Sequence, residues 1–190
     1  MDVSGIMQDF WVFGYGSLMW RPGFAFEEQR PALLRGAHRS LCVFSHVHRG
    51  TPERPGLVLG LDQGGSCRGT AFRVAPERWS EVVTYLRARE QVTDVYREAV
   101  RKVSFTDRNG SGAADALVFL IDRRHRQYAG RLTVEQQVPL ILQGCGISGQ
   151  CSEYVRSTVL HLRELGIHDP ELEAVMAALD GQEAVLTPGK

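Results

Sequence analysis

The sequence predicts an α+β fold: a small, mixed or mostly antiparallel β-barrel with flanking helices. Three features of the chain lead to this prediction. Stretches rich in β-branched and aromatic residues follow one another through the first 75 residues. One segment with helical spacing then precedes two more strand-like stretches, and the last third of the chain switches to segments with helical spacing. Runs of strands followed by runs of helices are typical of α+β proteins, whereas regular alternation is typical of parallel α/β folds.

The expected strands are bounded by glycine, proline and polar residues, which favour turns. Gly64 and Gly65 can take the positive φ of a turn between two of these strands. Asn109-Gly110 is a strong signal for a hairpin between the last two. The expected strands are residues 11–13, 40–47, 57–61, 68–74, 96–105 and 114–121.

The expected helices carry recognisable start and stop signals. Pro76 suits the first turn of a helix, where no backbone N–H is needed. Thr133 with Gln136 has the spacing of a capping box, and Gly166 suits the position just after a helix end. The expected helices are residues 77–91, a segment beginning after Thr133, residues 151–165, and a segment from Asp169-Pro170 to about Gly181.

The composition is that of a globular protein that forms one domain. The chain has 190 residues, 43% of them hydrophobic, and its formal net charge is zero. A neutral chain gives no general attraction to nucleic acid or to an anionic membrane, and we expect neither as a partner. We expect a single domain, 1–190, with a core of about residues 10–180, a loose N-terminal leader and a loose C-terminal tail.

The four cysteines predict the compartment. Cys42, Cys67, Cys145 and Cys151 form no Cys-x-x-Cys pair, and their spacing suggests neither a zinc site nor a disulfide framework. We interpret them as small buried thiols in a reducing environment. The first nine residues also lack the basic and apolar regions of a signal peptide. Both features predict a cytoplasmic protein.

The segment after the first strand is the first candidate site. Gly14 and Gly16 flank Tyr15, so the strand should break into a tight loop that ends near Leu18. Ser17 offers a hydroxyl there, and backbone N–H groups with little bulk around them can bind an anion or an oxyanion. The alternative is a simple turn with no binding role. Met19 stands where a dinucleotide fingerprint or a nucleophile elbow requires glycine, so neither motif is present.

Glu90 is the second candidate. On a helical wheel of residues 77–91, Trp79, Val82, Val83 and Leu86 form an apolar face, and Glu90 falls within it. A carboxylate on such a face is either partnered or has a raised pKa, and a raised pKa suits a general base near neutral pH. The alternative is a glutamate at a helix end that pairs with a nearby arginine, at position 87, 89 or 97, and keeps its head in solvent.

Three weaker patterns remain open. His46 and His48 share one side of a possible strand, a spacing that can bind metal, but no third ligand is evident. Ser17 or Cys42 with a histidine could form a nucleophilic hydrolase, although the spacing selects no pair. The basic run 123–126 is better interpreted as a solvated turn than as a nucleic-acid contact.

Several segments together resemble one family. Trp11-Val-Phe-Gly-Tyr-Gly-Ser-Leu-Met-Trp20 and Tyr85-Leu-Arg-Ala-Arg-Glu-Gln91 are similar to motifs of the ChaC-type γ-glutamylcyclotransferases, which act on glutathione. The resemblance continues, in the family's order, through residues 49–56, 67–72, 96, 116–122 and 146–154. It therefore spans about residues 10–165.

The resemblance implies a γ-glutamylcyclotransferase-like barrel and a lyase that converts glutathione to 5-oxo-L-proline and L-cysteinylglycine without cofactor or metal. It implies Glu90 as the catalytic acid/base. We expect glutathione as the partner of a protein that is a monomer or weak dimer. Alternatives are another γ-glutamyl amine or amino acid as substrate, or a γ-glutamyl-binding protein without turnover. The implied substrate-binding residues are Val12, Phe13, Gly14, Tyr15, Gly16, Ser17, Leu18 and Tyr154.

Overall fold

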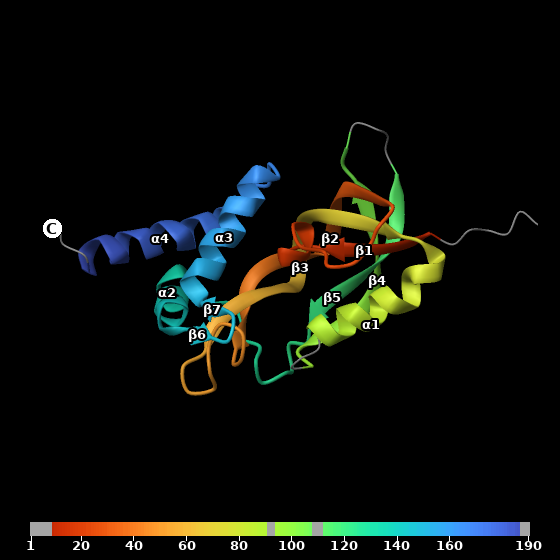
Figure 1. Cartoon of the computed structure of the whole chain (residues 1–190). Helices are drawn as coiled ribbons and strands as arrows, with labels where there is room; N and C mark the ends of the chain where they lie inside the picture. The colour runs from red at the N-terminus through yellow and green to blue at the C-terminus, as the bar shows by residue number, and fades with distance from the viewer. Residues whose placement is uncertain (1–8, 91–93, 108–111, 187–190) are drawn as a thin grey trace, which may run out of the picture. The chain divides into compact units, whose positions relative to one another are not determined.

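The computed structural model describes residues 9–90, 94–107 and 112–186. Five strands close into a barrel with the neighbour order β1-β3-β2-β4-β5 (Figure 1). Strand β1 pairs antiparallel with β3 and parallel with β5, so the barrel is mixed, as predicted. The strands are β1 (Phe10–Gly14), β2 (Glu28–Ser45), β3 (Gly56–Val74), β4 (Tyr96–Phe105) and β5 (Ala113–Ile121).

Helices follow the barrel strands in two places. A 3-10 turn, η1, follows β1, and a second one, η2, leads into α1 between β3 and β4. The last third of the chain holds three helices and a small hairpin of β6 and β7. These elements are η1 (Ser17–Met19), η2 (Pro76–Arg78), α1 (Trp79–Glu90), α2 (Val134–Gln143), β6 (Cys145–Gly146), β7 (Gly149–Gln150), α3 (Cys151–Glu164) and α4 (Pro170–Leu186).

Strands β2 and β3 are much longer than the sequence predicted. Residues 40–45 of the expected strand 40–47 are the end of the 18-residue β2, and residues 46 and 47 lie beyond it. The expected strands 57–61 and 68–74 are one strand of 19 residues. Gly64 and Gly65 do have positive φ, 95° and 67°. Glycines with positive φ can bend a strand without ending it, as they do in bulges. The expectation of a turn at 62–65 was therefore wrong, although the backbone angles behind it were right.

The helix signals mark the observed helix ends well. Pro76 opens η2, which continues into α1. The capping box at α2 is present, and Gln136 Oε1 accepts a hydrogen bond of 2.9 Å from the Thr133 backbone N–H. Helix α4 continues past Gly181 to Leu186. The predicted turn at Asn109-Gly110 lies outside the described residues.

The chain separates into two compact units, and the strands β2 and β3 contribute to both. The first unit comprises Met1–His38 and Gln63–Leu120, and the second comprises Arg39–Asp62 and Ile121–Lys190. The prediction that the chain behaves as one domain stays a prediction.

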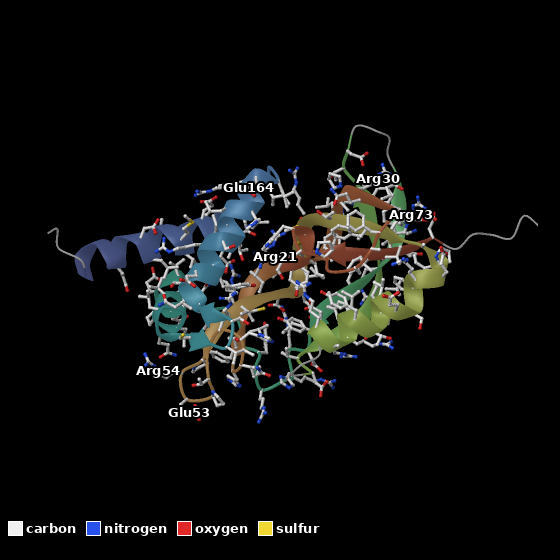
Figure 2. All side chains as sticks on the ribbon, viewed as in Figure 1. Arg21, Arg30, Glu53, Arg54, Arg73 and Glu164 are labelled. Carbon is white, nitrogen blue, oxygen red and sulfur yellow. The ribbon has the colours of Figure 1, made fainter. Side chains whose placement is uncertain are left out.

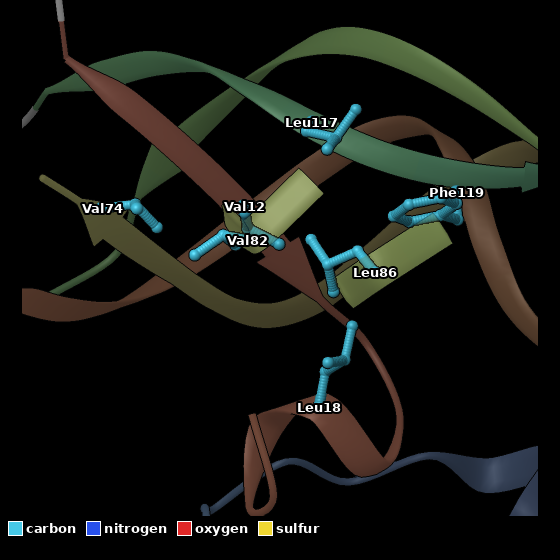
Figure 3. Packing of buried hydrophobic residues seen from close by; sticks show 7 residues of the cluster. All are labelled: Val12, Leu18, Val74, Val82, Leu86, Leu117 and Phe119. Carbon is cyan, nitrogen blue, oxygen red and sulfur yellow. The ribbon is translucent and has the colours of Figure 1, made fainter. Parts of the chain in front are cut away.

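The core of the first unit lies where α1 packs on the barrel. Leu86 and Val82 of α1 contact apolar residues of β1, β3 and β5 (Figure 3). The start of the helix is held by Trp79, whose ring stacks on Phe10 with centroids 4.8 Å apart. The buried cluster is Val12, Leu18, Val74, Val82, Leu86, Leu117 and Phe119.

The second unit is built around the last three helices, which contact one another. The segment after β5 returns to the end of β2, where Phe44 N–H donates to Gln127 O and Ala129 N–H donates to Cys42 O, both at 2.8 Å. Helix α4 starts beside Arg39, whose buried guanidinium is 3.1 Å from Asp169 Oδ2. The buried apolar residues of its helices are Val138, Ile141, Val155, Val159, Leu162, Leu172, Val175 and Leu179.

Three of the four cysteines are buried free thiols, as expected, but Cys145 is exposed. It lies in β6, a two-residue strand of a surface hairpin that cannot cover it. The reducing compartment and the cytoplasmic location remain predictions. Among the described residues, no helix has both the length and the apolar character needed to cross a membrane.

Candidate active site

The loop after β1 is as tight as its glycines predicted. A Cβ atom at Gly14 would lie 3.1 Å from the Leu18 Cβ, closer than most side-chain contacts. The neighbouring strand needs a glycine as well, because a Cβ at Gly69 would lie 2.2 Å from the Gly14 carbonyl oxygen. Met19 N–H donates to Gly16 O at 2.9 Å, which closes the turn η1.

The predicted substrate-binding residues of this segment divide into two groups. The buried ones are Val12, Phe13, Gly14, Tyr15 and Leu18. Leu18 points toward Leu86 of α1 (Figure 3). Gly16 and Ser17 are partly exposed. The apolar side chains therefore anchor the loop in the core, and Gly16 and Ser17 are its partly exposed members.

Glu90 is the last residue of α1, one turn after the fully buried Leu86 and on the same face. Its side chain is only 17% exposed. Burial raises the pKa of its carboxyl group, and the positive charge of Arg89 opposes that rise. A carboxyl group with a raised pKa holds a proton more readily than an exposed glutamate does, which suits proton transfer near neutral pH.

Arg89 connects the loop to the end of α1, although the sequence indicated it only as a possible partner for Glu90. Its Nε lies 3.5 Å from Glu90 Oε1. Its Nη2 donates to Ser17 Oγ at 2.7 Å, and its Nη1 donates to Arg21 O at 2.8 Å and to Tyr85 Oη at 3.0 Å. The spacing of Tyr85 and Arg89, four residues apart on one helix, was the only sequence signal for part of this network.

The alternative prediction, in which an arginine pairs with Glu90 at the helix end, is confirmed only in part. Arg87 instead forms two hydrogen bonds with Glu98 of β4, at 2.7 and 2.9 Å. Arg89 is beside Glu90, but the carboxylate is not held out in solvent, because most of its surface is covered. Glu90 thus has a positively charged neighbour and is also mostly buried.

Comparison with known proteins identifies the family. A family model described as "ChaC-like protein" matches residues 10–182. The chain belongs to this ChaC-like family. It is 32% identical over 185 residues to the glutathione-specific γ-glutamylcyclotransferase of Escherichia coli, covering 94% of this chain and 79% of the relative. It is 31% identical over 167 residues to γ-glutamylcyclotransferase 2-3 of Arabidopsis thaliana, covering 84% and 82%.

A solved structure confirms the predicted fold of this ChaC-like chain. The crystal structure of a yeast γ-glutamyl cyclotransferase specific to glutathione superposes with a TM-score of 0.82 at 22% identity. The match covers 92% of this chain and 96% of the yeast chain. The barrel with its helices is therefore a γ-glutamylcyclotransferase-like fold.

Tyr154, the remaining predicted binding residue, belongs to the second unit of the ChaC-like chain. Its hydroxyl oxygen accepts a hydrogen bond of 3.2 Å from the Leu59 backbone N–H. The guanidinium carbon of Arg49 lies 5.4 Å from its ring centroid. Cys151 belongs to the same helix, α3, and its Sγ accepts a hydrogen bond from the Leu57 backbone N–H and donates one to the Leu57 carbonyl oxygen. Two of the family-like segments, 49–56 and 146–154, thus meet in this unit.

The competing chemistries find little support in the described residues. Burial raises the pKa of the Cys42 thiol to about 12 and that of Cys151 to about 11, so neither is a ready thiolate nucleophile. Residues 9–90, 94–107 and 112–186 contain no group of three potential metal ligands. His48 bonds instead to Ser148 Oγ at 2.9 Å. In the basic run after β5, Arg123 Nε donates a hydrogen bond of 2.6 Å to Asp62 Oδ1, which agrees with a structural turn.

A separate hollow of about 660 Å³ lies on the first unit, beside Trp11 and Phe105. Arg30 and Arg73, both labelled in Figure 2, line it. Their charges are matched by carboxylates: Arg30 bonds to Asp107 at 2.7 and 2.8 Å, and Arg73 bonds to Glu27 and Glu28. The positive charges of the two arginines that line the hollow are therefore already balanced by neighbouring carboxylates.

Proposed function

We propose that this chain is a γ-glutamylcyclotransferase that converts glutathione to 5-oxo-L-proline and L-cysteinylglycine, with Glu90 as the general acid/base. The observation that carries the proposal is the mostly buried carboxyl group of Glu90, with its raised pKa, linked through Arg89 to the family's glycine-rich loop. The relatives from E. coli and yeast are named as glutathione-specific cyclotransferases, which supports glutathione as the substrate.

The reaction is an internal aminolysis, and the first requirement is a base. The α-amino group of the γ-glutamyl residue is protonated at neutral pH and cannot attack. The ionised carboxylate of Glu90 takes one proton, and the neutral amine then attacks the γ-carbonyl carbon of the same residue. A raised pKa brings the carboxylate closer in proton affinity to the amine than an exposed glutamate would be.

The second requirement is geometry. The γ-glutamyl chain must fold so that its nitrogen meets its own carbonyl carbon, and holding a near-attack geometry can supply about 7–11 kcal/mol in favourable cases. The anchored loop 14–18 is suited to hold the α-carboxylate. The first hydrogen bond of its turn is donated by Met19, so the N–H groups of Ser17 and Leu18 precede it and can face an anion or the developing oxyanion.

The third requirement is departure of the cysteinyl amine. Protonated Glu90 returns its proton to the leaving nitrogen as the C–N bond breaks. The attacking nitrogen changes from NH₃⁺ to a lactam NH and loses two protons, while the leaving nitrogen gains two and departs as an ammonium group. No net proton is consumed, so one carboxyl group that is alternately base and acid is sufficient.

The test is incubation of the purified chain with glutathione and detection of both products by mass spectrometry. We expect turnover by the wild type and a loss of at least about a hundredfold in Glu90→Gln, since general acid–base catalysis contributes about 10²–10⁴. Glu81→Gln is the matched control, because Glu81 is an exposed glutamate on the same helix. Near-wild-type turnover by Glu90→Gln would remove Glu90 from the mechanism.

A substrate panel separates glutathione from the alternatives. We expect glutathione to be preferred over γ-glutamyl amines and γ-glutamyl amino acids, in line with the names of the relatives. Preference for one of the others would keep the mechanism and change the substrate. Binding of glutathione without product would instead indicate a γ-glutamyl-binding protein.

A further inference from the structure

Arg89 is surrounded by protein acceptors from three segments. Its guanidinium donates to Ser17 Oγ, to the carbonyls of Arg21 and Pro22, and to Tyr85 Oη, with distances of 2.7 to 3.3 Å. Its Nε faces Glu90. An arginine has five N–H donors in a fixed planar fork and no acceptor. The planar guanidinium group of Arg89 binds the loop, the segment after it and α1 at the same time, and so it holds these three segments together.

We propose that Arg89 is a positioning residue. It orients the Ser17 hydroxyl as a hydrogen-bond donor to the substrate, and it fixes the position of the loop relative to Glu90. The proposal rests on the proposed function, because it assigns Ser17 and Glu90 to the same γ-glutamyl site.

The role of Ser17 follows from hydrogen-bond chemistry. A hydroxyl group has one proton to donate and lone pairs that accept. Arg89 can only donate, so Ser17 Oγ is the acceptor in their 2.7 Å contact. The proton of Ser17 is therefore directed to a different partner. A carboxylate or a carbonyl oxygen of the γ-glutamyl group is such a partner, and the charge on Arg89 strengthens the Ser17 O–H as a donor.

The second effect of Arg89 is on proton transfer. Its positive charge lowers the pKa of Glu90 and so opposes the effect of burial. The other ionisable groups on α1 and on the elements around it include Tyr15 in the loop, Tyr85 and Arg87 on α1, and Tyr96 and Glu98 on β4. Arg87 and Glu98 bind each other. Removal of the charge at Arg89 should therefore move the acidic limb of the pH–rate profile to higher pH.

The experiment is a double-mutant cycle with glutathione as substrate and kcat/KM measured across pH. Ser17→Ala and Arg89→Met should each lower the plateau by about 10- to 100-fold, the range for hydrogen bonds to charged groups. The double variant should lie within a few-fold of the worse single variant, since Arg89 acts through Ser17. Only variants lacking the charge at Arg89 should shift the acidic limb.

Two further variants make the result specific. Arg89→Lys keeps a charge but not the fork, so we expect a lowered plateau with the acidic limb close to that of the wild type. Should Arg89→Met not fold, the same cycle with Arg89→Lys measures the coupling to Ser17. Arg87→Met is the control, because it removes an arginine from the same helix whose partner is Glu98, and it should leave kcat/KM unchanged.

The possible outcomes distinguish failure of the positioning role of Arg89 from failure of the proposed enzymatic function. Independent, multiplicative effects of Ser17→Ala and Arg89→Met, or an unshifted limb in Arg89→Met, would overturn the positioning role while the wild type still turns over glutathione. A wild-type chain that releases no 5-oxoproline from glutathione would refute the proposed function itself, and with it the role of Arg89.

Discussion

Gly23→Ala tests the packing of the segment after η1 against α1, on which the Arg89 contacts depend. Gly23 has a φ of 75°, and a Cβ there would lie 2.0 Å from Tyr85 Oη and 2.7 Å from Tyr85 Cζ. The left-handed backbone costs an alanine about 1–2 kcal/mol, and overpacking typically costs about 1–3 kcal/mol more. The expected loss of stability is therefore about 2–5 kcal/mol.

The assay is thermal unfolding followed by circular dichroism, with Gly36→Ala as the matched control. Gly36 also has a positive φ, 84°, but a Cβ there would meet nothing within 4 Å. The control should therefore lose only the backbone part, about 1–2 kcal/mol. A chain of this size loses about 2–4 °C in Tm per kcal/mol, so Gly23→Ala should fall several degrees below Gly36→Ala. Equal Tm values for the two variants would refute the close contact with Tyr85.

Three further predictions concern charge and burial. Because the pKa of Glu90 is raised in the folded state, the wild type should lose stability as pH rises from the unfolded-state pKa through the folded-state pKa. The Tm of Glu90→Gln minus that of the wild type should thus increase over this window, and a constant difference between pH 4 and 8 would contradict the buried carboxyl group. Asp169→Asn removes the charge facing the buried Arg39 and should cost about 1–3 kcal/mol in urea unfolding, whereas a loss below about 0.5 kcal/mol would show that the pair contributes little. Maleimide should label the native chain once, at Cys145, and rapid labelling of Cys42 or Cys151 would contradict their burial.

Local signals in the sequence predicted the elements that hold the site. The aromatic and β-branched run before Gly14 is β1, and the apolar face of residues 79–86 packs on the barrel as α1. The wheel also placed Glu90 on the buried side, because helical periodicity alone determines that position. The family was predicted from the loop and the helix end together, and the family match confirms it.

Features that depend on contacts between distant segments could not be predicted. Glycines with positive φ look the same in sequence whether they end a strand or bend it, so β3 was expected as two strands. The exposure of Cys145 depends on a hairpin of four paired residues. The contacts of Arg89 with Ser17 and Arg21 join positions about 70 residues apart, and no local pattern predicts such pairs.

We infer that the carboxyl group at the end of α1 drives ring closure of a γ-glutamyl substrate that the loop after β1 holds. The most direct measurement is the release of 5-oxoproline from glutathione by the wild type and by Glu90→Gln, followed by mass spectrometry under identical conditions. We expect steady formation of 5-oxoproline and cysteinylglycine in equal amounts by the wild type and at least about a hundredfold less by a folded Glu90→Gln. Equal rates for the two proteins, or no 5-oxoproline from either, would contradict it.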